Sequence, residues 1–311
     1  MDKTIKNKGI FFLFLKLILL LGVSYLLFTQ LSSVKLDDWK TIELKHPIFL
    51  ILSCVLLVLN WGFEWLKWTN ILKLINTNTS KKINFRAFMA GIATGLITPN
   101  MIGNFIGRMY YFKKELRPSI ILMTLISSFS QFFASIFFGL LSLFILNETP
   151  FGLTTSTITI SIFLFCCILL LFYFKFEKLK WRYLTRKKHF SKVVEFIKSD
   201  KSFRMRLLVL SLGRHFIFTL QFWLMFNAFE DALSVDAFLW IWQIFFWTTL
   251  VPSLWFGKLV IRESIALLVL GSIGFGQVEI LTASVLIWIV NLALPSLVSL
   301  FICRQNKIEI E

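Results

Sequence analysis

The sequence contains few of the residues from which enzymes build active sites. Among its 311 residues there are three histidines and four cysteines, and 17 acidic residues are outnumbered by 33 lysines and arginines. The histidines are scattered, and no HExxH, GxSxG or aspartate-rich run provides a metal or nucleophile motif. The cysteines lack metal-ligand spacing, so we expect buried thiols instead. We therefore predict that the chain binds no metal or cofactor and is not an enzyme.

Long polar stretches are scarce as well. The chain is 57% hydrophobic, with 36 phenylalanines and 11 tryptophans, and its mean hydropathy is +0.76. A soluble domain could not bury this much apolar surface, and the apolar runs do not alternate as the strands of a membrane barrel do. The formal charge of +16 is accompanied by no nucleotide-binding motif and no nucleic-acid motif. We predict an all-α polytopic membrane protein that is not driven by ATP and has no nucleic-acid partner.

Six apolar segments are long enough to cross a hydrocarbon core of ~30 Å as helices. They cover residues 10–30, 47–68, 118–146, 157–174, 207–228 and 278–302. Twelve of the 33 lysines and arginines lie in the segment 175–206, which the positive-inside rule makes a cytoplasmic loop. Both termini are then cytoplasmic, and residues 1–311 form one multi-pass domain of the plasma membrane. Alternatively, the basic loop serves as a docking site for a partner protein.

The segment 87–114 is apolar but interrupted. Thr98-Pro99-Asn100 stands at its middle and Arg108 in its second half, and proline disfavours a continuous helix at this point. Each half is about 16–18 Å long as a helix, roughly half of a membrane core. We predict a re-entrant helical hairpin that enters from the cytoplasmic side and turns at mid-membrane.

The same pattern recurs in the segment 237–270. It breaks between Val251 and Lys258, a stretch with Pro252, Ser253 and Gly257, and its second half carries Arg262-Glu263. A second re-entrant hairpin, entering from outside, fits its length. Together the sequence predicts six full transmembrane helices and two re-entrant hairpins in an inverted-repeat arrangement, which is typical of transporters.

Charged side chains inside the predicted spans are candidates for a binding site. Arg108 and Arg262 each follow a hairpin break, where their planar forks are suited to a phosphate; alternatively they extend to the interface or pair with Glu64 or Glu263. Asn60, Glu64 and Lys67 share one face of the second span among tryptophans. We interpret that face as an interfacial anchor, the alternative being that Glu64 lines a substrate path.

The broken segments resemble a known family. Thr98-Pro99-x-x-x-Gly103-x-x-x-x-Arg108 is similar to the signature of the flippase-like membrane region of lysylphosphatidylglycerol synthases. Pro252, Gly257 and Arg262-Glu263 resemble its later stretch, and Asn291 with Pro295 resembles its closing pattern, so the likeness covers essentially the whole chain. Asn104 stands where the family often has an acidic residue.

The resemblance implies a lipid translocator without the soluble synthase domain that two-domain relatives carry. We predict that it moves a phospholipid or related anionic or zwitterionic lipid between leaflets, alone or as a homo-oligomer, with a separate cytoplasmic lipid-modifying enzyme as a partner. The predicted substrate-binding residues are Thr98, Pro99, Asn100, Gly103, Asn104, Arg108, Pro252, Ser253, Gly257, Arg262 and Glu263.

Two other functions stay open at this point. One is a membrane transferase acting on a lipid-linked substrate, for which Glu64 and Glu263 are the embedded carboxylates. The other is a non-transporting docking protein that works through its basic loop.

Overall fold

The computed structural model describes residues 40, 42–75, 79–96, 98, 103–149, 155–175, 201–230, 235–250 and 257–303. All of its regular elements in these ranges are helices. The predicted first span, 10–30, and most of the predicted basic loop lie outside the described residues. So do Pro99, Asn100, Pro252 and Ser253 at the two predicted breaks.

The helices follow the predicted apolar segments. They are α3 (Pro47–Leu74), α4 (Lys81–Leu96), α5 (Gly103–Met109), α6 (Arg117–Leu146), α7 (Thr155–Lys175), α9 (Lys201–Asn227), α10 (Asp236–Leu250), α11 (Gly257–Gly271), α12 (Gln277–Trp288), the π-helix η3 (Ile289–Ala293) and α13 (Leu294–Ile302). Four stretches within the described residues are long and apolar enough to cross a membrane: α3, α6, α9 and the continuous segment α12–η3–α13. The chain is an all-α membrane protein.

Two helices begin before the predicted membrane segments. Helix α4 begins at Lys81, before the predicted hairpin start at 87, and α9 begins at Lys201, inside the predicted loop 175–206. Hydropathy marks where a chain crosses the hydrocarbon core, but a helix can continue into the headgroup layer, where lysine and arginine are solvated. Because basic residues are typical of loops as well, hydropathy alone does not predict these first helical turns.

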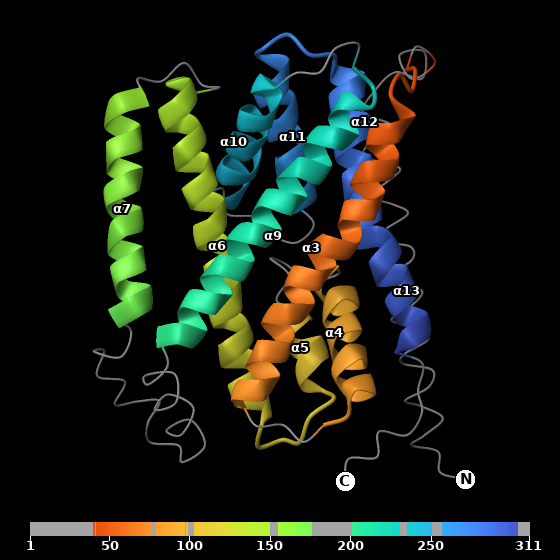
Figure 1. Ribbon diagram of the computed structural model, residues 1–311, viewed down its shortest axis with the longest axis vertical. Helices are drawn as coiled ribbons and strands as arrows, with labels where there is room; N and C mark the ends of the chain where they lie inside the picture. Colours follow the sequence, from red (N-terminus) through yellow and green to blue (C-terminus); the bar gives the residue numbers. More distant parts are fainter. Residues whose placement is uncertain are drawn as a thin grey trace.

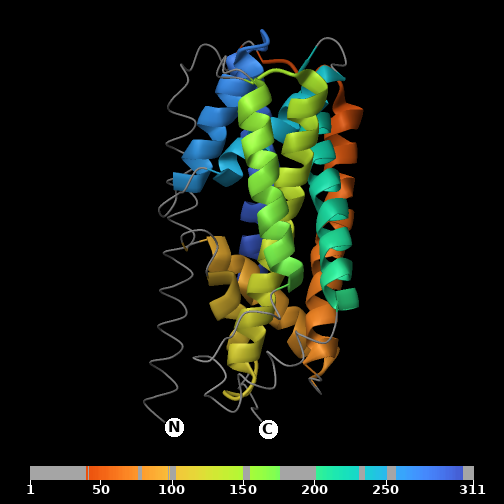
Figure 2. The same ribbon diagram turned by 90° about the vertical axis from the view of Figure 1, so that its left-hand side faces the viewer.

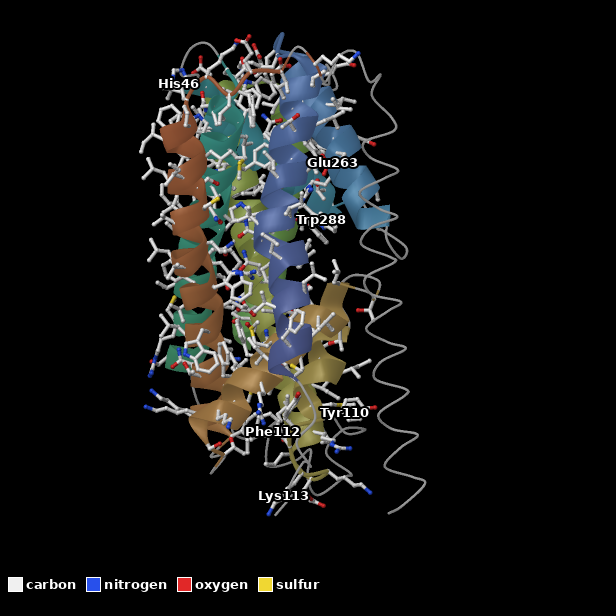
Figure 3. All side chains as sticks on the ribbon, turned by 90° about the vertical axis from the view of Figure 1, so that its right-hand side faces the viewer. His46, Tyr110, Phe112, Lys113, Glu263 and Trp288 are labelled. Carbon is white, nitrogen blue, oxygen red and sulfur yellow. The ribbon has the colours of Figure 1, made fainter. Side chains whose placement is uncertain are left out.

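The two interrupted segments form two helix pairs. Helix α4 packs on α5, and α10 packs on α11. Figures 1 and 2 show the two pairs at opposite ends of the bundle. Figure 3 shows the same separation through single residues, because Glu263 of α11 lies toward the end marked by His46, and Phe112, just after α5, lies toward the opposite end.

The first half of the bundle (α3–α6) and the second half (α9–α13) each pack a short helix against a long helical segment of the other. Helix α3 packs on α9, while α10 packs on α6 of the first half and α4 packs on α13 of the second. This reciprocity is what an inverted repeat of the unit α3–α6 requires. The register agrees, because the interval from Gly103 to Gly257 and from Arg108 to Arg262 is 154 residues in both cases, and each glycine begins its helix. The re-entrant character of the two pairs and the total of six spans stay predictions.

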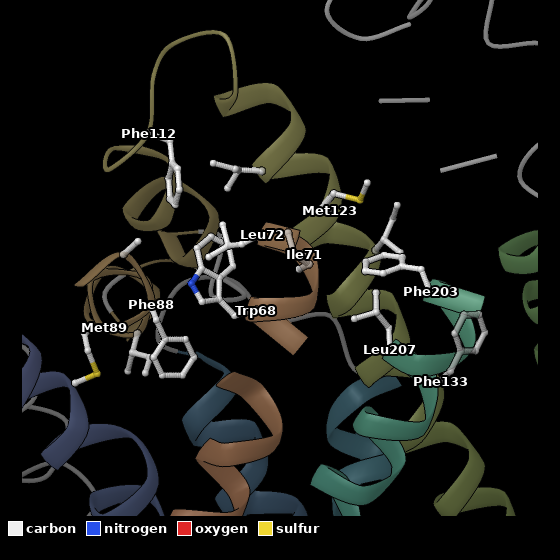
Figure 4. Close-up of a cluster of buried hydrophobic side chains, with 14 of the residues drawn as sticks. Trp68, Ile71, Leu72, Phe88, Met89, Phe112, Met123, Phe133, Phe203 and Leu207 are labelled. Carbon is white, nitrogen blue, oxygen red and sulfur yellow. The ribbon is translucent and has the colours of Figure 1, made fainter. Parts of the chain in front are cut away.

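Apolar side chains fill the bundle in separate clusters. The first joins α3, α4, α6 and α9 around Trp68, with Phe112 packed edge-on against that indole (Figure 4). The second joins α9 to α12 around Phe222 and Phe226. Within a membrane the hydrophobic effect does not drive helices together, so van der Waals contacts between these closely packed side chains favour helix association. The clusters hold the two halves of the bundle as packed units.

The outer surface of α3 is more apolar than its inner face. Val55, Val58 and Leu59 are exposed, whereas Ser53, Asn60 and Lys67, at intervals of seven residues, are buried. Contiguous exposed apolar surface is unfavourable in water but is solvated by lipid tails. Helix α3 therefore turns its hydrocarbon side to the membrane and its polar stripe to the interior of the protein.

Candidate functional site: a cation-rich cluster between α3, α5 and α9

Glycines bring α5 onto α4 without intervening side chains. A Cβ atom at Gly107 would lie 2.5 Å from the Ala90 carbonyl oxygen and closer still to Thr94 Oγ1. A Cβ at Gly103 would collide with the Thr94 carbonyl group. The Thr94 hydroxyl instead lies 2.6 Å from the Gly103 carbonyl oxygen and ties the two helices together. The motif glycines are therefore required by close backbone packing.

The Thr98 side chain caps the start of α5. The Gly103 backbone N–H donates to Thr98 Oγ1 at 2.6 Å, and that hydroxyl lies 3.0 Å from the Thr94 carbonyl oxygen. The first backbone N–H group of α5 therefore has a hydrogen-bond partner within the protein. Thr98 and Gly103 therefore have a structural role: they fix the start of α5 and with it the position of Arg108, about one and a half turns farther along the helix.

Arg108 enters the interior of the protein from α5. Only 1% of its side chain is exposed, and its Nη2 donates to Glu64 Oε1 of α3 at 3.0 Å. The guanidinium carbon lies 4.8 Å from the ring centre of Trp68 and 5.4 Å from that of Phe88. Such cation–π contacts are favourable where water is excluded. The head of Arg108 is therefore fixed on two sides by aromatic rings and on a third by a carboxylate.

Glu64 also forms ion pairs with two further cations. Arg214 Nη1 of α9 donates to Glu64 Oε2 at 3.1 Å, and Lys67 Nζ lies 3.2 Å from the same oxygen. We call Glu64, Lys67, Arg108 and Arg214 the Glu64 cluster. Among the described residues it combines three cations with one carboxylate, an excess of two positive charges. Uncompensated charge in a protein interior is costly, so these cations favour an anionic partner at this place.

The interpretation of this face as an interfacial anchor is wrong. Lys67 is buried and faces α6, where its Nζ lies 3.5 Å from Gln131 Oε1, instead of extending to the membrane surface. Arg214 likewise turns inward to Glu64. In sequence, the neighbouring tryptophans of this helix end are typical of an interfacial belt, but in the structure Trp68 is buried and forms the floor of the cluster.

Amide side chains extend the cluster along α3 and α9. Arg214 Nε donates to Asn60 Oδ1 at 3.2 Å, and Asn60 Nδ2 donates to Gln221 Oε1 at 3.1 Å and to Asn291 Oδ1 at 2.6 Å. Beyond them, Gln221 Nε2 donates to the Ser53 carbonyl oxygen at 2.9 Å, and the Ser53 hydroxyl donates to the Gln221 carbonyl oxygen at 2.9 Å. Asn291 comes from the π-helix η3, an element that is frequent at functional sites. A row of polar side chains thus follows the contact between α3, α9 and η3.

Two polar atoms beside the cluster have no hydrogen-bond partner among the described residues. They are Arg108 Nε, a donor, and Asn104 Oδ1, an acceptor, one turn apart on α5. Both lie against Gly91 of α4, where an added Cβ would come within 2.8 Å of the first and 2.6 Å of the second. Buried polar groups are ordinarily paired, so these atoms mark unused hydrogen-bonding capacity next to the excess charge.

The second predicted arginine has a different environment. Arg262 pairs with the adjacent Glu263, and its Nη2 also donates to the Ser284 carbonyl oxygen at 3.1 Å. Both side chains are largely buried, and the pair is neutral. Gly257 begins α11 and lies five residues, more than one helical turn, before Arg262. The structure does not bring Arg262 and Glu263 into the Glu64 cluster.

We expect the neutral pair to be structural. Replacing Arg262 with glutamine leaves Glu263 buried without its cation, which should lower the apparent melting temperature in detergent. The double variant Arg262→Gln/Glu263→Gln removes both charges and should recover most of that loss. Thermal unfolding of the three proteins measures this difference. Equal destabilisation by the single and double variants would contradict the assignment.

The predicted substrate-binding residues did not include Asn60, Glu64, Lys67 or Arg214, and a substrate path along Glu64 was only the alternative to an interfacial anchor. Two signals in the sequence point to these residues: the helical face shared by Asn60, Glu64 and Lys67, and the position of Arg214 inside the predicted span 207–228, from which it could extend to the interface or point into a cavity. Within the described residues, no group of three or more His, Cys, Asp or Glu side chains lies close enough to hold a metal ion.

Comparison with known proteins gives one match. The family model described as the lysylphosphatidylglycerol synthase TM region aligns with residues 13–299, which is nearly the whole chain. No curated protein and no solved structure matches.

Proposed function

We propose, since this chain belongs to the lysylphosphatidylglycerol synthase TM region family, that it moves a phospholipid or a related anionic or zwitterionic lipid between membrane leaflets. The family makes the chain a membrane protein linked to lipid metabolism or translocation. Movement of the lipid itself, in the plasma membrane and with cytoplasmic termini, is our proposal.

The observation that supports it most strongly is the charge excess of the Glu64 cluster. Three cations surround one carboxylate in the interior of a lipid-exposed bundle, and two of them are arginines from different helices. Arginine forks match the oxygen geometry of a phosphate, and charge-assisted hydrogen bonds of this kind are stronger than neutral ones. A lipid phosphate is an anion of the kind that such a group of cations attracts.

Only the head group has to enter the protein. The exposed faces of α3, α6 and α13 are apolar and can contact acyl chains, while the row from Ser53 to Lys67 provides polar partners inside. Asn104 beside Arg108, together with Thr98, Asn100 and Ser253 of the helix pairs, would hydrogen-bond other parts of the head group. A rocking movement of one predicted repeat against the other would expose the site to each leaflet in turn.

The cluster is less suited to a transferase. A general base needs a carboxylate that can accept a proton, whereas both oxygens of Glu64 are engaged by cations. We therefore propose a translocator that is not an enzyme, acting alone or as a homo-oligomer and receiving its lipid from a separate cytoplasmic lipid-modifying enzyme.

A translocation assay in proteoliposomes tests the proposal. We expect fluorescent phospholipids labelled at the head group to become accessible to an external quencher faster in protein-containing vesicles than in empty ones. The panel should include anionic, zwitterionic and cationic head groups, and protein inactivated by heat serves as the control. If no lipid in the panel moves while thermal unfolding shows a folded protein, the proposal is overturned.

A further inference from the structure

We infer that Glu64 is an internal substitute for the lipid phosphate: its carboxylate occupies the cation cluster in the empty protein, and the substrate must displace it. The inference rests on the proposed function for the identity of the ligand, and on the geometry of the cluster for the role of Glu64.

The bonding of Glu64 is that of a bound anion. One carboxylate oxygen accepts from Arg108 at 3.0 Å, and the other lies 3.1 Å from Arg214 and 3.2 Å from Lys67. A phosphodiester likewise presents two charged oxygens on one centre and carries a single negative charge. Exchange of one anion for the other therefore keeps the local charge excess at two, so the interior does not have to accommodate an additional charge during binding.

The cluster is fixed on one side and open on the other. Arg108 and Lys67 are 1% and 2% exposed, and Arg108 is held between Trp68 and Phe88. Glu64 is 15% exposed and Arg214 32%. The anion and the more accessible arginine are thus the parts of the cluster that have room to move, while the two buried cations keep their positions.

Competition of this kind limits affinity in a useful way. Three clustered cations without a counter-ion would retain a phosphate tightly and release it slowly. With Glu64 ready to return, the departing lipid leaves a compensated site instead of three bare charges, so the release step becomes more favourable. Glu64 is in this sense a positioning residue for the cations and a competitor of the substrate.

Equilibrium binding of a short-chain anionic glycerophospholipid, below its critical micelle concentration, tests the inference by calorimetry on the purified full-length protein. We expect Glu64→Gln to tighten binding by about tenfold or more, because tenfold corresponds to about 1.4 kcal/mol and one charge-assisted hydrogen bond is worth about as much. Glu43→Gln, which removes an exposed carboxylate outside the helices, should leave the affinity unchanged.

A double variant distinguishes competition by Glu64 from an effect of net charge on binding. It is also less prone to misfold than the single variant. Glu64→Gln/Lys67→Gln keeps two arginines, so its cluster has the same excess of two charges as the natural protein, and it leaves fewer bare cations than the single variant. We expect it, too, to bind the probe more tightly than the natural protein. If it binds no more tightly while folded, net charge explains any effect of Glu64→Gln, and the inference is overturned.

Translocation of the same lipid class provides the second readout. Glu64→Gln should move lipid more slowly than the natural protein, because release is retarded. If both glutamine variants bind more tightly but the natural protein moves no lipid, the role of Glu64 is upheld and the proposed function fails. If the natural protein moves lipid but neither variant binds more tightly, the function is upheld and the role of Glu64 fails.

Discussion

Replacing Arg108 with glutamine is expected to slow lipid translocation by at least about 100-fold, since the loss of one or two charge-assisted hydrogen bonds to a phosphate costs about 3 kcal/mol. The substitution removes the most deeply buried cation of the cluster, which is 1% exposed. Glu64 keeps Arg214 and Lys67 as partners, so the variant should still fold. The rate of quenching in proteoliposomes measures the effect, with thermal unfolding as the check on folding.

Two further variants interpret the result. Arg206→Gln removes an exposed arginine of α9 that donates to Ser202 on its own helix, and it should translocate at the natural rate. Arg108→Lys keeps the charge but loses the planar fork, so its rate should lie between those of Arg108→Gln and the natural protein. A folded Arg108→Gln protein that translocates normally would remove the Glu64 cluster from the transport path.

The second large effect is expected from a single methyl group at Gly107. In Gly107→Ala the new Cβ would lie 2.5 Å from the Ala90 carbonyl oxygen and would also overlap Thr94, and a backbone oxygen cannot rotate away as a flexible side chain can. Overpacking of this kind typically costs about 1–3 kcal/mol. Because α5 must move off α4, Arg108 leaves the cluster, and we expect translocation to be lost along with stability.

Gly62→Ala is the matched control. Gly62 lies in the middle of α3, and a Cβ there would meet no described atom within 4 Å. Alanine favours the helix by about 1 kcal/mol over glycine, so this variant should be as stable as the natural protein or slightly more. Apparent melting temperatures and translocation rates should be compared for both variants. If Gly107→Ala behaves like Gly62→Ala, close packing of α5 on α4 is not required for function.

The helices could be predicted from sequence because hydropathy reports directly on which segments can enter lipid. Broken segments could be found for a similar reason, since proline and glycine act on the backbone locally. The helix starts at Lys81 and Lys201 could not be found this way, because basic residues are compatible with either a loop or a helix in the headgroup layer. Local rules thus predicted the elements but not all of their ends.

The site could be predicted only in part. Arg108 and Thr98 could be singled out because they belong to a motif within one segment. The partnership of Glu64 with Arg214 joins residues 150 positions apart, and such contacts depend on which helices pack together. Arg108 and Arg262 were predicted to have the same role because each follows a break in an apolar segment. Their neighbours differ, since one lies in a cation-rich cluster and the other beside its own carboxylate.

The charge excess of the Glu64 cluster also connects the protein to the membrane voltage. A charge that crosses the whole membrane field changes its energy by about 2.3 kcal/mol per 100 mV, and any partial displacement of the cluster along the membrane normal involves a proportionate share. A zwitterionic lipid that brings its own cation and an anionic lipid that does not would carry different total charge through the same field. The resting potential of the cell would therefore act on the two kinds of cargo unequally, even if both used the same site.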